Sequence, residues 1–170
     1  MTPRGLGAIA AVLALIADQG SKLFLLYRAD FVHMPSDGSV PVLPFFNLVM
    51  VWNPGISYGL FPASSKVGTF ALVGLSLLAV LGLGWWLWQT TSRSLALGLG
   101  LVIGGAIGNN LIDRLIYGAV ADFFHFYAFG YDWYVFNVAD AAITFGVIAL
   151  LYDALLQPET HATSGKSQVE

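Results

Sequence analysis

Residues 120–140 read VADFFHFYAFGYDWYVFNVAD, and two aspartates in this stretch, Asp122 and Asp140, stand among apolar and aromatic residues. The residues that follow, 141–152, read AAITFGVIALLY and are apolar enough to form the body of a membrane helix. A carboxylate at the end of such a helix loses hydration, so it must be paired with another group, be protonated or serve a function. If the fold brings the two aspartates together, they will share a proton, because like charges in close contact do not both ionise cheaply. Such a pair is the catalyst of an aspartic peptidase, so the stretch predicts a hydrolytic site.

The composition places the chain in a membrane. Of its 170 residues, 57% are hydrophobic and only 10% are charged, and the mean hydropathy is +0.74. Soluble domains carry about 25% charged residues. The formal net charge of −3 gives no basic surface for nucleic acid. The chain has no cysteine, which excludes disulfides, thiolate catalysis and cysteine-ligated metals.

Four apolar runs are long enough to span a bilayer, which needs about 20 helical residues. We predict an integral membrane, mainly α-helical protein: a four-transmembrane-helix bundle with a small extramembrane β-rich cap, forming one domain over 1–158. The spans are expected at about 6–27, 67–88, 95–116 and 135–156, with a disordered tail at 159–170. Gly100, Gly104 and Gly108 form a small-residue stripe that allows a second helix to approach closely.

The first run has an alternative interpretation. Residues 8–17, AIAAVLALIA, fit the apolar core of a cleavable signal peptide. However, the apolar run resumes at Phe24 after the polar patch at residues 18–22, which favours a span. Asp18 and Lys22 in that patch are spaced i,i+4, so they can form an ion pair on one helix face.

The two longest links between spans lie on one side of the membrane. In the first, a turn at residues 36–39 and the runs 40–43 and 45–52 predict two short strands, restricted by Pro41 and Pro44 to an edge or an irregular piece. Residues 52–61 contain Gly and Pro and are a candidate lid. The second link, 117–134, is rich in aromatic residues that suit a membrane interface.

Polar residues crowd at this same side, at the ends of the spans and in the links. Intramembrane polar residues are functional by default, and here four segments contribute them. Each also has a structural interpretation: an ion pair for Asp18 and Lys22, helix–helix hydrogen bonds for Asn109 and Asn137, headgroup contact for Arg114, a turn for Asn53 and a water-facing loop carboxylate for Asp122. His33 and His125 have no second ligand at helical spacing, so we expect no metal site.

Two rival functions remain open from the residues themselves. A small proton-coupled transporter would use Asp140 to bind and release protons, but it predicts polar residues along the whole membrane depth and an internal repeat. A structural scaffold of glycine-packed helices would leave the Asp122–Asp140 pairing without a purpose.

Five segments of the chain resemble motifs of one family, the bacterial lipoprotein signal peptidases (signal peptidase II). They are DQGSK at 18–22, NPGISYG at 53–59, GGAIGNNLIDR at 104–114, VADF at 120–123 and FNVAD at 136–140. Two positions depart from the pattern expected of the family. Tyr58 replaces a phenylalanine, and Ala141 replaces a common serine near Asp140.

The resemblance implies an aspartic endopeptidase of the bacterial inner membrane that works without a cofactor or metal. It implies that both termini are cytoplasmic and that the site lies near the periplasmic face. Asp122 and Asp140 match the catalytic pair. The motif residues expected around the substrate are Asp18, Lys22, Asn53, Gly55, Asn109, Arg114, Asn137 and Ala139.

The same resemblance defines the expected partners. The substrate is a prolipoprotein whose cysteine already carries a diacylglyceryl group, and cleavage falls just before that cysteine. Membrane lipid surrounds the enzyme, and globomycin-type cyclic peptides are the expected inhibitors. We expect a monomer and no nucleic acid. On physical grounds one aspartate acts as general base on water and the other as general acid, and the sequence leaves open which one carries the proton at rest.

Overall fold

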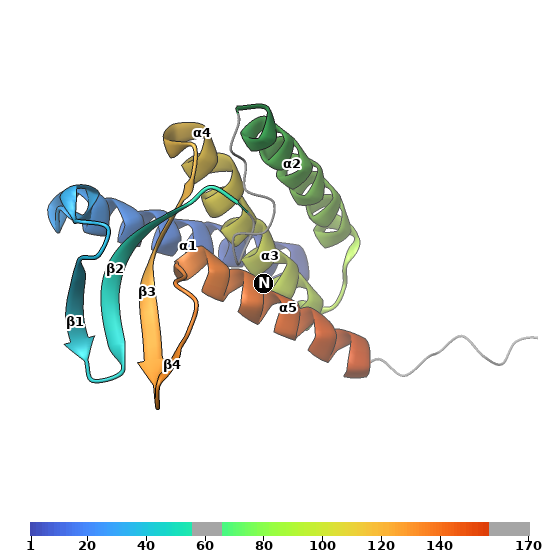
Figure 1. The fold of residues 1–170 in the computed structure, drawn as a ribbon. Helices are drawn as coiled ribbons and strands as arrows, with labels where there is room; N and C mark the ends of the chain where they lie inside the picture. The colour runs from blue at the N-terminus through green and yellow to red at the C-terminus, as the bar shows by residue number, and fades with distance from the viewer. Residues whose placement is uncertain (56–65, 157–170) are drawn as a thin grey trace, which may run out of the picture.

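Four long apolar helices dominate the computed structural model, which describes residues 1–55 and 66–156 (Figure 1). Two of them, α1 and α3, are followed by short helical segments. The helices of the described residues are α1 (Pro3–Leu23) with η1 (Phe24–Arg28) and η2 (Phe31–His33), α2 (Lys66–Gln89), α3 (Arg93–Ala106) with η4 (Ile107–Asp113) and α4 (Arg114–Tyr117), and α5 (Val138–Leu156). The predicted mainly helical membrane fold is confirmed. The candidate lid at 52–61 lies mostly outside the described residues, as does the predicted tail at 159–170.

The helices that are long and apolar enough to cross a membrane are Pro3–Arg28, Lys66–Gln89, Arg93–Tyr117 and Val138–Leu155. The fourth helix begins at Val138 and not near residue 135, so Asp140 lies in its first turn. The first and third spans continue through π-helical segments, η1 and η4. Such wide turns often occur at functional sites because they redirect side chains that a regular helix would leave elsewhere. In this fold η4 carries Asn109 and Asp113.

Helix α3 lies between α1 and α5 and packs extensively on both. The predicted glycine stripe faces α1: a Cβ on Gly100 or Gly104 would overlap the backbone of Gly7 or Ala11, and one on Gly108 would overlap the Asp18 carboxylate. On the other side of α3, a Cβ on Gly105 would come within 2.6 Å of the Ala139 carbonyl oxygen at the start of α5. Glycine therefore sets both helix separations.

Helix α2 differs from the other three spans because none of its residues is buried. It contacts mainly α3 and η4, and Figure 1 shows it standing on the far side of α3 and α4 from the strands. Apart from Ser76 and Thr69 its span is apolar on all sides, as expected for a helix that faces lipid on most sides.

The α2–α3 link is tied to the end of α5 remote from the sheet. Ser92 caps α3 by accepting a hydrogen bond from the backbone N–H of Leu95 (3.3 Å). The carboxylate of Asp153 on α5 accepts hydrogen bonds from the hydroxyls of Ser92 and Ser94. This cluster is a structural contact at the opposite end of the bundle from Asp122 and Asp140.

The extramembrane cap is a four-stranded antiparallel sheet in the order β1 (Ser39–Leu43), β2 (Phe46–Asn53), β3 (Val120–Ala128) and β4 (Tyr131–Asp132) (Figure 1). The two strands predicted in the first link are present as β1 and β2. Strand β3 was not predicted, because its aromatic residues also suited a membrane interface. It joins the second link to the first and brings Asp122 opposite Val51.

The sheet rests on a small apolar core beside the end of α1, made of Leu25, Leu26, Phe31, Met50, Ala121 and Phe123. Ala121 and Phe123 point into this core. Because side chains alternate along a strand, Asp122 between them points to the opposite face. The alternation of β3 therefore directs this carboxylate toward the helices.

Candidate active site

Asp122 lies near the start of β3 with its side chain almost fully enclosed, at 2% exposure. Two asparagines donate hydrogen bonds to its carboxylate. Asn53 at the end of β2 donates from Nδ2 to Oδ2 (3.2 Å), and Asn137, just before α5, donates from Nδ2 to Oδ1 (2.6 Å). Residues from two segments far apart in the sequence therefore hold this carboxylate.

Asp140 is the third residue of α5 and forms a capping box with Asn137. The Asp140 N–H donates to Asn137 Oδ1 (3.0 Å), and the Asn137 N–H donates to Asp140 Oδ2 (3.1 Å). Reciprocal bonds of this kind satisfy two backbone donors at a helix start. The other carboxylate oxygen, Oδ1, accepts a hydrogen bond from Asn109 Nδ2 (2.9 Å). The positive end of the α5 dipole also favours a negative charge here.

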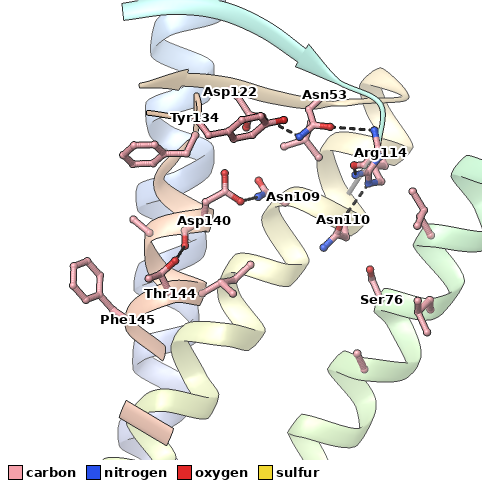
Figure 2. A pocket seen from close by; sticks show the side chains of 18 of the residues that line it. Asn53, Ser76, Asn109, Asn110, Arg114, Asp122, Tyr134, Asp140, Thr144 and Phe145 are labelled. Atoms are coloured by element: carbon pink, nitrogen blue, oxygen red, sulfur yellow. Dashed lines mark hydrogen bonds between the residues drawn. The ribbon is translucent and has the colours of Figure 1, made fainter. Parts of the chain in front are cut away.

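Each of the four carboxylate oxygens of Asp122 and Asp140 thus accepts a hydrogen bond from an asparagine. Figure 2 shows the two side chains facing the same space between β3, α5 and η4. Asn137 touches both of them and joins the two positions. The structure therefore brings the predicted pair together.

The orientation of each asparagine amide is fixed by a second contact. The backbone N–H of Gly55 donates to Asn53 Oδ1 (3.1 Å), and the Lys22 ammonium donates to Asn109 Oδ1 (2.6 Å). Asn137 Oδ1 accepts from a backbone N–H, as described above. In all three residues the oxygen is engaged by a donor, so the NH₂ group must face the carboxylate.

A cavity of about 800 Å³ lies beside the pair (Figure 2). The polar side chains that line it include Asn53, Asn109, Asn110, Arg114, Asp122 and Asp140, together with Ser76 on α2, Tyr134 and Thr144 on α5. Its apolar walls come from α2, with Leu72, Leu75 and Ala79, and from α5, with Ala141, Ile143 and Phe145. A large apolar hollow with a few convergent polar groups is the usual form of a ligand site.

Burial raises the pKa of Asp122 from 3.8 to about 7, and the neighbouring charge of Asp140 adds to this effect. Hydrogen bonds from Asn53 and Asn137 and the charge of Lys22 oppose it. Near neutral pH this carboxyl group is therefore close to half protonated. A pair that holds one proton in this range can supply both an acid and a base.

Arg114 at the start of α4 is buried, with 4% exposure. It donates to the carbonyl oxygens of Pro54 (3.0 Å) and Gly55, and to Asn110 Oδ1 (3.2 Å). Its guanidinium therefore holds the chain that follows β2 in place and does not reach toward headgroups.

A second polar cluster lies behind the pair, away from the cavity. The Lys22 ammonium contacts Asp18 Oδ2 (2.8 Å) and Asp113 Oδ2 (2.8 Å), and Gln19 Nε2 donates to both carboxylates (3.0 Å each). The predicted Asp18–Lys22 ion pair is present. Asp18 Oδ1 also accepts a hydrogen bond from the backbone N–H of Ala139, next to Asp140 (3.0 Å).

The predicted site residues thus fall into two groups. Asn53, Gly55, Asn109 and Arg114 line the cavity with the two aspartates, whereas Asp18, Lys22, Asn137 and Ala139 do not line it. Sequence reasoning gave no role to Gln19, Asp113 or Asn110, although all three stand inside the polar motifs. On α2 the cavity wall includes Ser76, and a polar residue inside an apolar span was a signal that sequence reasoning did not use. Within residues 1–55 and 66–156, no three His, Cys, Asp or Glu side chains gather as metal ligands would.

The chain is similar to known proteins over most of its length. The family model described as "Signal peptidase (SPase) II" matches residues 10–156. A lipoprotein signal peptidase of Nitrobacter hamburgensis is 54% identical over 161 residues, which covers 92% of this chain and 96% of the relative. One of Methylocella silvestris is 47% identical over 170 residues, covering 100% and 97%.

The fold has solved counterparts as well. A bacterial membrane enzyme determined by the in meso method at 2.3 Å resolution superposes with a TM-score of 0.77 at 26% identity, covering 97% of this chain and 95% of that one. A second such enzyme, determined at 1.9 Å, gives a TM-score of 0.74 at 30% identity. The match in sequence runs through both aspartates and every segment that supports them, and this chain therefore belongs to the signal peptidase II family of membrane proteases.

Proposed function

We propose that Asp122 and Asp140 are the catalytic pair with which this protein cleaves diacylglyceryl-modified prolipoproteins just before the lipidated cysteine. Membership of the family supplies the reaction, because its members are lipoprotein signal peptidases. The observation that carries the assignment of residues is the pairing itself. A buried carboxyl group from β3 and a partly buried one from α5 are joined through Asn137, and both line the 800 Å³ cavity.

The pair acts by general acid–base catalysis on a bound water. One carboxylate takes a proton from the water, whose oxygen attacks the scissile carbonyl carbon, while the protonated partner donates to the carbonyl oxygen. After this step the first carboxyl group has gained a proton and the second has lost one, so the two exchange roles. The tetrahedral intermediate then collapses: the first carboxyl group gives its proton to the leaving nitrogen, the C–N bond breaks, and the second carboxylate takes the proton of the hydroxyl that becomes the new carbonyl, which restores the pair. This chemistry needs one proton on the pair at the start, which the raised pKa of Asp122 supports.

The cavity walls fit an amphiphilic substrate. Apolar side chains from α2 and α5 face each other across the hollow, while the asparagines and Arg114 gather at the end where the aspartates lie. A signal peptide and acyl chains would lie along the apolar walls, and the peptide bond to be cut would reach the polar end. Asn109 lies at that polar end, where it can hold the substrate backbone in an extended form that exposes its carbonyl groups.

The arrangement of spans supports a location in the bacterial inner membrane. Both long links, the sheet and the aspartates lie at one end of an even number of spans, and the two described chain ends lie at the other. We assign the aspartate end to the periplasmic face and the termini to the cytoplasm. The protein acts as a monomer in this proposal, and globomycin-type cyclic peptides compete for the cavity.

The test uses the full-length protein in detergent or lipid vesicles with a synthetic diacylglyceryl lipobox peptide. The wild type is expected to cut before the modified cysteine and to be blocked by a globomycin-type peptide. Asp122→Asn and Asp140→Asn should each abolish cleavage while the protein still inserts and unfolds cooperatively. Full activity in either variant would overturn the assignment of the pair, and equal cleavage of the unlipidated peptide would overturn the assigned substrate.

A further inference from the structure

We infer that Lys22 is a positioning residue for catalysis: its buried ammonium, held by Asp18 and Asp113, fixes the Asn109 amide so that its N–H binds Asp140. This inference rests on the proposed role of Asp140. It moves Lys22 and Asp18 from substrate contact to support of the catalyst, and it gives a role to Asp113 and Gln19, which the reaction itself does not use.

The first step of the argument is the coordination of the ammonium. Lys22 Nζ has three protons and three acceptors, namely Asp18 Oδ2 (2.8 Å), Asp113 Oδ2 (2.8 Å) and Asn109 Oδ1 (2.6 Å). Lys22 and both carboxylates are 1% exposed or less. A lysine with all its donors engaged in a buried site has no freedom to reach a substrate.

The second step is what the ammonium does to Asn109. An ammonium group donates only, so the atom of the Asn109 amide that faces it must be the oxygen. The Nδ2 group is therefore turned toward Asp140, where it donates to Oδ1 (2.9 Å). Without the ammonium the amide could rotate by half a turn and present its oxygen to a carboxylate, which repels it. The lysine thus sets the hydrogen bond that Asp140 receives.

The third step is the anchoring of the cluster. Gln19 donates to Asp18, to Asp113 and to the Gly108 carbonyl oxygen (3.4 Å). Asp113 Oδ2, the oxygen that contacts Lys22, also accepts a hydrogen bond from the backbone N–H of Ala121 (3.2 Å). Ala121 is the residue before Asp122. Asp18 binds the N–H of Ala139, the residue before Asp140.

One cluster therefore holds the backbone beside each catalytic aspartate. Among the described residues, no buried side-chain nitrogen or oxygen lacks a hydrogen-bond partner. A fully satisfied polar network rigidifies the groups that it contains, whereas the loss of one member leaves the others unpaired.

The same cluster acts on the charge state of the pair. The charged groups that act on Asp122 from the surrounding elements are Lys22 on α1, Arg114 on α4 and Asp140 on α5. Asp18 on α1 and Asp113 on η4 hold the Lys22 ammonium. The positive charge of Lys22 lowers the pKa of Asp122 against the larger effect of burial. Its removal should therefore shift the alkaline limit of activity to higher pH.

The experiment compares kcat, KM and the pH profile of the full-length wild type with those of Lys22→Met, on the same lipopeptide. Lys22→Met should lower kcat about 10- to 100-fold, as when an outer partner that orients an active-site ligand is lost, and should leave KM within about threefold. The alkaline limit should move to higher pH. Asp113→Asn, which keeps the ammonium but weakens its hold, should lower kcat less, with KM again unchanged.

A double-mutant cycle identifies the route of the effect. If Lys22 acts through Asn109, the double variant Lys22→Met/Asn109→Ala will lose no more kcat than Asn109→Ala alone. Asp153→Asn at the far end of α5 is the matched control: it should lower thermal stability without changing kcat or the pH profile. If Lys22→Met does not fold, the cycle of Asp113→Asn with Asn109→Ala replaces it.

Three results would overturn the inference: a rise in KM with kcat unchanged, multiplicative losses in the cycle, or an unmoved pH limit. None of these results would contradict the assignment of the catalytic pair, which is wrong only if an Asp122 or Asp140 variant stays active.

Discussion

Asn137 and Asp140 cap the start of α5 for each other: the Asp140 N–H binds Asn137 Oδ1 (3.0 Å), and Asp140 Oδ2 accepts the Asn137 N–H (3.1 Å). A group proposed to activate water is thus also part of a helix cap. The two roles are compatible because the cap uses one oxygen of the carboxylate and the backbone of Asp140. They also mean that a change at this position affects both stability and activity.

Asp140→Ala should therefore lower stability as well as abolish cleavage. The variant leaves the Asn137 N–H and the Asn109 amide without their acceptor. Loss of a capping interaction costs about 1 kcal/mol, and an unpaired buried donor adds about 1–3 kcal/mol. Thermal unfolding in detergent should show the lower melting temperature. A melting temperature equal to that of the wild type would contradict the capping role.

Asp122→Asn should raise the stability of the folded protein at alkaline pH, in contrast to Asp140→Ala, and the size of this effect should depend on pH. In the unfolded chain this carboxyl ionises near 3.8, and in the folded protein it ionises near 7. The unfolded state releases its proton first, so wild-type stability falls as the pH rises from about 4 to about 7 and then levels off.

The asparagine removes this buried charge, which stabilises the folded state by on the order of a few kcal/mol. It also places an NH₂ group against the fixed amide of Asn53 or Asn137, which destabilises the folded state by about 1 kcal/mol. Asp122→Asn should thus match or exceed wild-type stability at pH 8 and lose that advantage at pH 5. Unfolding at both pH values with one detergent measures this. A variant less stable than the wild type at pH 8 would show that Asp122 is not destabilised by burial.

The activity of the wild type should fall on the alkaline side near pH 7. The mechanism needs one proton on the pair, and Asp122 loses that proton as the pH passes about 7. A profile of kcat/KM from pH 5 to 9 on the lipopeptide would show the limb, because kcat/KM reports the pKa values of the free enzyme. An alkaline limb near pH 9 would show that another group controls the reaction.

The sequence predicted the helices, the first two strands and a pair of aspartates at the cavity for identifiable reasons. Spans follow from apolar length, and Asp18 and Lys22 meet because four residues make about one helical turn. Asp122 and Asp140 stood out because carboxylates at the end of an apolar run have few acceptable environments.

Contacts between distant segments could not be found in the same way. The contact of Lys22 with Asp113 and Asn109 depends on how closely α1 approaches α3. The glycines of α3 allow this close approach, but the sequence alone does not say which helix packs against them. Strand β3 was missed because aromatic side chains suit an interface loop as well as a strand. On the α2 wall of the cavity only Ser76 is polar, and the apolar residues beside it carry no pattern that separates them from the lipid-facing side.

The close contact of α3 with α5 gives a final prediction, in which glycine controls the position of Asp140. A Cβ on Gly105 would lie 2.6 Å from the carbonyl oxygen of Ala139, the residue before Asp140, and 2.7 Å from Ile143. Gly105→Ala should therefore push the start of α5 away from α3, lowering stability by about 1–3 kcal/mol and reducing kcat. Gly82→Ala on α2 is the matched control, because nothing lies within 4 Å of its added Cβ.

The control should be neutral or stabilising by up to about 1 kcal/mol, since alanine favours a helix over glycine. Melting temperatures and cleavage rates of the two variants distinguish the steric effect of the added methyl group at residue 105 from the higher helix propensity of alanine. If Gly105→Ala gains stability as Gly82→Ala does, then α5 can shift without cost, and the place of Asp140 is set by its hydrogen bonds and not by helix contact.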